Sequence, residues 1–164
     1  MTRKARCCLI IVCFQFAIVG IATSPANAKS TITATIGSTI SDGEMSFKVV
    51  SFKCGISTIG TGLFSEKALG QFCVVTFTMK AAKKNAVNYF YSNQKGITKS
   101  GSKVEAKSAL LDDFKSMVDL NPGISITTKI AFDVAKNDPL AQIEFHDSMF
   151  SGGVLVSLVS QKKK

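Results

Sequence analysis

The feature that most constrains the fold is a regular alternation of apolar and polar side chains after a Pro-Gly pair. In the stretch LNPGISITTKIAFDVA (residues 120–135), Pro122 and Gly123 predict a turn. The residues predicted to point inward are Ile124, Ile126, Ile130, Phe132 and Val134, and those predicted to point to water are Ser125, Thr127, Lys129 and Asp133. A period of two with one wet face is typical of an antiparallel β-strand.

Similar short runs recur between turn signals spaced roughly every 8–12 residues, which is typical of a β-sandwich or barrel. About seven strands are expected in all, as in other sandwiches of this kind. In MSFKVVSFKC (residues 45–54) the parity changes between Val49 and Val50, which predicts a bulge or a strand covered on both faces. GGVLVSLVS, from residue 152, predicts a central strand. Residues 55–70 are rich in Gly, Ser and Thr and predict a long loop.

The pattern loosens over residues 104–120. Ala106, Leu110, Phe114 and Met117 have the spacing of one face of a short helix. Irregular chain is the equal alternative there, so the sequence leaves one short helix open.

The first residues predict a secretory signal peptide. A basic start, MTRKAR, is followed by an uncharged apolar run and by the small-x-small group Ala26-Asn27-Ala28. This order predicts cleavage before Lys29, so that residues 1–28 leave and residues 29–164 form a single domain with a short basic C-terminal tail. An uncleaved anchor is the alternative, because about 17 apolar residues is the lower limit for a membrane span. Cleavage is favoured, and no span is expected after it.

After cleavage the chain keeps 17 lysines and 11 acidic residues and contains no arginine. The positive charge favours solubility and nonspecific attraction to anionic surfaces. Specific recognition of phosphate and guanine commonly uses the planar guanidinium of arginine, which donates two parallel hydrogen bonds. The sequence also lacks the interleaved aromatic and basic residues that are expected for a groove that binds nucleic acid. Nucleic acid is therefore not expected as a partner.

Two cysteines, Cys54 and Cys73, remain after cleavage. An even pair in an exported domain first indicates a disulfide. The alternatives are two small buried thiols, or a redox or metal site. A metal site needs more ligands at close spacing, and the chain has one histidine and no CxxC motif.

No set of nucleophile, base and orienting group is evident, so no catalytic, cofactor-binding or metal site is expected. His146 alternates with apolar residues beside Glu144 and is predicted to be an exposed surface imidazole. Asp112, Asp113 and Asp119 are predicted to be solvated charges, with a calcium site as the alternative. No phosphate-binding glycine loop is present, because SGG at residues 151–153 is explained by a turn.

SFKVVSFKCG, GQFCVVTFTMK, LNPGISITTKIAFDV and a closing GGVLVSL resemble a family of secreted bacterial domains of unknown function. That family is similar to the mycobacterial immunoprotective extracellular antigen. The resemblance covers residues 31–159 and implies an all-β fold, an immunoglobulin-like antiparallel β-sandwich. It implies export but no agreed activity or ligand. The tryptophan and the distant cysteine pair of true immunoglobulin domains are missing.

The sequence therefore predicts an exported, non-catalytic immunoglobulin-like domain with a binding or interaction role at the cell surface or outside the cell. Its partner would be an unknown protein or a component of the cell envelope. One alternative is a small secreted enzyme or enzyme inhibitor that uses residues 112–119. Another is an electrostatic binder of anionic envelope polymers, which rests on the charge alone.

Overall fold

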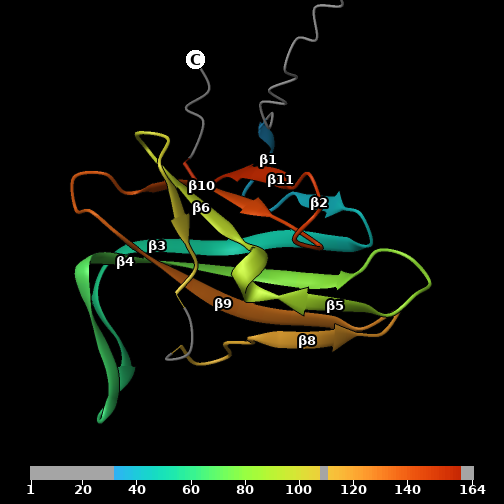
Figure 1. Cartoon of the computed structure of the whole chain (residues 1–164), viewed down its shortest axis with the longest axis horizontal. Helices are drawn as coiled ribbons and strands as arrows, with labels where there is room; N and C mark the ends of the chain where they lie inside the picture. The colour runs from blue at the N-terminus through green and yellow to red at the C-terminus, as the bar shows by residue number, and fades with distance from the viewer. Residues whose placement is uncertain (1–31, 108–110, 160–164) are drawn as a thin grey trace, which may run out of the picture.

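The alternating segments pair into two stacked β-sheets, as the computed structural model in Figure 1 shows. The structure describes residues 32–107 and 111–159, so the predicted signal peptide and the lysine tail lie outside it. The strands are β1 (Ile32–Thr35), β2 (Thr39–Asp42), β3 (Met45–Thr61), β4 (Phe64–Ala81), β5 (Val87–Phe90), β6 (Lys95–Thr98), β7 (Lys103–Glu105), β8 (Met117–Leu120), β9 (Ser125–Val134), β10 (Leu140–Phe145) and β11 (Val154–Ser157). One 3-10 turn, Tyr91–Asn93, separates β5 from β6.

One sheet has the strand order β1-β11-β10-β6-β7 and the other has the order β2-β3-β4-β9, while β5 and β8 pair as a separate ribbon. All pairs are antiparallel except β1 with β11, which run parallel. The prediction of an all-β sandwich is confirmed. The described residues form eleven strands instead of about seven, because several strands have only three or four residues and are too short to leave a clear alternation.

The core lies between the two sheets and is built around aromatic rings. Phe145 of β10 stacks on Phe47 of β3 with ring centroids 4.6 Å apart and meets Phe77 of β4 at 4.9 Å. From β9, the buried members of the predicted inward set are Ile130, Phe132 and Val134. Ile124 was predicted inward but is 50% exposed, because it lies before β9 in the Pro-Gly turn.

The sequence left open a short helix or irregular chain over residues 104–120, and the part of that segment that the structure describes contains no helix. It holds β7, a bridge between Lys107 and Ala131, and β8. Ala106 and Phe114 pack against the core from irregular chain, and Phe114 meets Tyr91 edge-on at 5.2 Å. Contact with the sandwich therefore accounts for apolar residues whose spacing suggested a helical face.

The prediction of a loop over residues 55–70 is also wrong, since β3 and β4 continue through most of it as one hairpin. In Figure 1 this hairpin hangs from the left-hand ends of the two strands. Its far part, residues 56–67, is called the arm below. The pairing shifts register between Val49 and Ser51, which confirms the bulge predicted from the change of parity.

No helix in the described ranges is both long and apolar enough to cross a membrane.

Candidate functional site

The arm exposes large apolar side chains at its end. Thr61 pairs with Phe64 across a two-residue turn that contains Gly62, whose φ of +57° suits a residue without a side chain. Leu63 in the turn is 100% exposed and Phe64 beside it is 77% exposed. Isolated two-stranded hairpins are marginally stable in water. The arm therefore needs support at its root, and its end offers an apolar contact surface.

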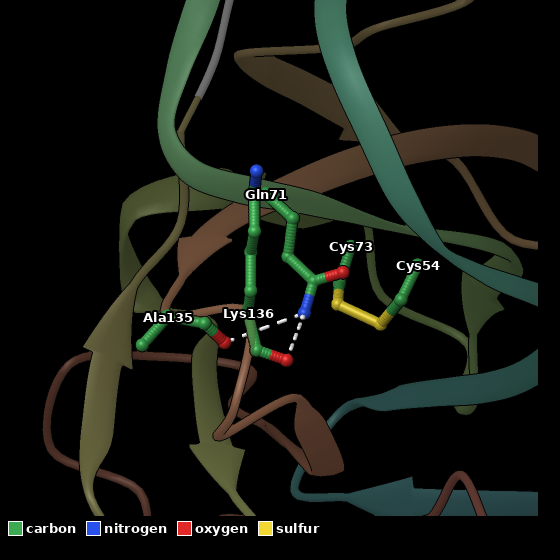
Figure 2. Close-up of a disulfide and its surroundings, with 5 residues drawn as sticks. All are labelled: Cys54, Gln71, Cys73, Ala135 and Lys136. Carbon is green, nitrogen blue, oxygen red and sulfur yellow. Dashed lines mark hydrogen bonds between the residues drawn. A yellow bond between two sulfur atoms is a disulfide. The ribbon is translucent and has the colours of Figure 1, made fainter.

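A disulfide supplies part of that support. Cys54 of β3 and Cys73 of β4 are bonded across neighbouring strands at the point where the arm leaves the sandwich (Figure 2). Lys53 pairs with Val74 and Ile56 with Phe72, so two residues of β3 oppose Cys73 alone. This is a bulge, and it bends β3 next to the bond. Both strands continue past the cysteines, so the bond joins mid-strand positions instead of the ends of a loop.

The β4 side of the root, residues 68–71, is called the elbow and is tied to β9 by polar contacts. The Asp133 carboxylate accepts hydrogen bonds from the backbone N–H groups of Leu69 (2.8 Å) and Gly70 (3.1 Å). Gln71 donates its side-chain N–H to the carbonyl oxygens of Ala135 (3.3 Å) and Lys136 (3.2 Å), as Figure 2 shows. These contacts hold the elbow against the sandwich while the Leu69 side chain is 100% exposed.

A small apolar cluster packs the arm against the outer face of the four-stranded sheet, the face that points away from the core. Ile59 of the arm, 4% exposed, packs with Phe72 of β4 and Ala131 of β9. A salt bridge of 3.7 Å between Glu66 and Lys107 lies nearby. The arm is thus anchored by apolar packing, a disulfide and polar contacts, while its end stays free.

The arm forms one wall of a hollow of about 370 Å³ on that outer face. The arm contributes Thr58, Ile59 and Thr61, and the strands contribute Lys53, Thr76 and Lys129. A second hollow, of about 190 Å³, lies farther along the same face and is lined by Lys48, Thr78, Lys80 and Ser125 among others. The face between them is polar and carries the Thr78–Thr127 hydroxyl contact at 3.0 Å.

A second exposed apolar patch lies near the end of β10. Met149 is 74% exposed and Phe150 is 91% exposed, and both line a hollow of about 490 Å³ together with Val87 and Phe90. Its rim carries the carboxylates of Glu44 and Asp147, among others.

The prediction that His146 is an exposed surface imidazole is wrong, since its side chain is only 15% exposed. The turn at residues 147–153 folds over the ring, whose Nδ1 lies 3.1 Å from Ser151 Oγ. Glu144 Oε2 lies 3.7 Å from Nε2, but this carboxylate is 4% exposed and forms a 2.6 Å salt bridge with Lys103. Ser151 Oγ also donates to the Ser148 carbonyl oxygen. These contacts hold the turn onto the sheet.

The three acidic residues considered for calcium are not brought together. Asp112 lines the hollow beside the arm, Asp113 forms a 3.4 Å salt bridge with Lys129, and Asp119 pairs with Asn88 in the β5–β8 ribbon. Within the described ranges, no three side chains of His, Cys, Asp or Glu are placed to share a metal ion.

Residues 34–155 match the family model described as a domain of unknown function, DUF4352. The chain belongs to this family. That match and the fold confirm the predicted resemblance to secreted domains of unknown function. No curated protein matches the chain significantly.

Three solved structures share the fold with this member of the family. MPT63, a secreted protein of Mycobacterium tuberculosis, is 21% identical, with a TM-score of 0.59 over 75% of this chain and 94% of that one. The yjhA protein of Bacillus subtilis is 14% identical, with a TM-score of 0.61 over 77% and 99%. An uncharacterised β-sandwich protein of Clostridium difficile is 11% identical, with a TM-score of 0.51 over 83% and 100%. At these identities the likeness shows the fold alone.

Sequence reasoning found the cysteine pair but missed the arm. One signal was available: Gly62 and Leu63 are flanked by the strand-forming residues Thr61 and Phe64, as in a two-residue hairpin. The outer-face lysines were counted in the net charge, but nothing in the sequence alone placed them on one sheet.

Proposed function

We propose that this protein is an exported, non-catalytic interaction domain that contacts a protein partner through the end of its arm. The observation that carries the proposal is the exposure of Leu63 and Phe64 at the end of a hairpin whose root is cross-linked. Full burial of each such side chain contributes about 1.5–3 kcal/mol. Because the root is fixed, little conformational entropy is lost when a partner covers the end.

The disulfide, the family and the likeness to a secreted protein support a location outside the cytoplasm. The predicted signal peptide agrees with this, and a partner in the envelope or the culture fluid is expected. The packing of His146 supports a structural role over a catalytic one, because its neighbours Glu144 and Ser151 have other partners. A hydrolytic activity that disappears in Ser151→Ala would contradict the non-catalytic part of the proposal.

The test is capture of partners from envelope and culture-fluid fractions by the immobilised mature protein. Leu63→Ser with Phe64→Ser should abolish retention of a partner that the wild-type protein holds. The matched control is Met149→Ser with Phe150→Ser, which removes the same kind of exposed side chain from the other patch and should retain that partner. If only the control lost the partner, the contact surface would lie at the patch of Met149 and Phe150, and the proposal would be overturned.

A further inference from the structure

The outer face of the four-stranded sheet gathers lysines and hydroxyl groups. It carries Lys48 and Lys53 from β3, Lys80 from β4 and Lys129 from β9, at positions that point away from the core. Between them lie hydroxyls from three strands, namely Ser51, Thr76, Thr78, Ser125 and Thr127. Both hollows described on this face include lysine and hydroxyl side chains in their lining.

Three of the four lysines on this face have no salt-bridge partner in the part of the chain that the structure describes, whereas Lys129 pairs with Asp113 at 3.4 Å. On the other sheet, Lys95 pairs with Glu105 at 2.5 Å and Lys103 pairs with Glu144 at 2.6 Å. Within the described residues, Lys48, Lys53 and Lys80 are exposed and form no salt bridge. Charge complementarity therefore points to an anionic partner on this sheet and not on the other.

The lysines are spread along a track instead of converging on one point. Lys48 faces Thr78 and Lys80 faces Ser46, so the two lysines are diagonal neighbours whose Cβ atoms lie roughly 7–8 Å apart. Lys53 lies five residues beyond Lys48, about 16 Å along β3 at the usual rise per residue. Such spacing suits a chain with repeated negative charges better than a small anion.

We infer that this face binds a carboxylated polysaccharide laid along the strands from Lys80 to Lys53, with the arm as the wall at one end. Ammonium groups meet the carboxylates in charge-assisted hydrogen bonds, and the serine and threonine hydroxyls meet the sugar hydroxyls. This site goes beyond the proposed protein contact, because it uses the sheet and not the end of the arm.

Two observations favour sugar carboxylates over phosphate polymers and nucleic acid. Compact phosphate sites commonly add free backbone N–H groups to their cations, whereas the N–H groups of β4 lie in strand pairing on both sides. Bases are usually held by aromatic stacking. Phe72, the aromatic residue on this face, is buried beneath the arm.

The test measures binding of the mature protein to immobilised polygalacturonate at low salt. Lys48→Gln, Lys53→Gln and Lys80→Gln together should weaken binding about tenfold or more, because each exposed ion pair contributes up to about 1 kcal/mol. The control Lys84→Gln, Lys99→Gln and Lys136→Gln removes the same charge from turns and should change affinity much less. Equal losses in the two triple variants would overturn the site, since binding would then follow net charge. Melting curves of both variants check that they fold.

Further probes identify the ligand class. We expect stronger binding to polygalacturonate than to polyglutamate of equal charge, and weakening of that preference in Thr76→Val with Thr78→Val. Equal binding to polyglutamate, or tighter binding to polyphosphate or to vesicles rich in phosphatidylglycerol, would overturn the assignment to a carboxylated sugar polymer. Loss of binding on deletion of Lys162–Lys164 alone would place the contact on the tail. The arm variant Leu63→Ser with Phe64→Ser should bind the polysaccharide normally, so this inference and the proposed function can fail separately.

Discussion

Removal of the Cys54–Cys73 bond should destabilise the protein mainly through its effect on the unfolded chain. The two cysteines are 19 residues apart, and closing a loop of that length lowers the entropy of the unfolded state by an amount worth about 3 kcal/mol at 25 °C. In a domain of this size, 1 kcal/mol shifts the melting temperature by a few degrees. We therefore expect Cys54→Ala with Cys73→Ala to lower the melting temperature by roughly 10 °C.

The sandwich itself should still form, because the bond lies at the root of the arm and not between the two sheets. The assay is thermal unfolding followed by circular dichroism, with the wild-type protein measured oxidised and reduced. Reduction removes the constraint but leaves both sulfur atoms in place, so it is the matched control for any void left by alanine. Thiol counting on the unfolded, unreduced mature protein should find no free thiol. Two free thiols, or a melting temperature that changes by less than about 2 °C on reduction, would refute the reasoning.

Three further changes test the contacts around the site. Gly70→Ala should destabilise the protein by about 1–3 kcal/mol in urea unfolding, because a Cβ there would lie 2.2 Å from the Val134 carbonyl oxygen. The control Gly152→Ala should be nearly neutral, because the space around that glycine is open. A hydrogen bond from the Ser100 hydroxyl lowers the pKa of the Asp138 carboxyl in the folded protein. The contact therefore stabilises the fold at pH values above the pKa that Asp138 has in the unfolded chain, and this stabilisation is lost as the pH falls through the folded pKa. In an NMR titration, Ser100→Ala should raise the pH at which Asp138 is half protonated. His146→Ala should lower stability by about 1 kcal/mol, because it removes the ring contact with Ser151, and unchanged stability would restore the prediction of an exposed imidazole.

The sheet that carries the site was accessible from the sequence because local alternation decides which face of a strand is buried. The alternation after Pro122 placed the inward residues of β9 correctly, and the change of parity at Val49 marked the bulge in β3. The nearly continuous apolar run that contains β11 marked a strand with neighbours on both sides, β1 and β10. In each case one short segment contained the whole signal.

The arm and the partly buried imidazole of His146 were missed because each depends on contacts that the local alternation does not contain. Glycines interrupt the alternation in residues 55–70, and pairing across the arm restores a strand that composition alone did not indicate. His146 comes directly after β10, and its ring lies 3.7 Å from the carboxylate of Glu144, the residue that shares its parity in the alternation. The following turn then covers the ring, and Gly153 permits this approach because a Cβ there would lie 2.5 Å from the imidazole ring.

The most direct test of the central claim is amide hydrogen exchange across the arm in the oxidised, mature protein. Residues 56–67 must form a paired hairpin fixed at its root, since both the contact at Leu63 and the wall of the hollow depend on that order. Backbone amides that lie in the pairing of Ile59 with Glu66 should exchange well below the rate of an unstructured chain, and reduction of the disulfide should speed them up more than amides of the β4–β9 pairing. Exchange at the rate of an unstructured chain throughout residues 56–67 would contradict the account, because the segment would then be the loop that its composition suggests.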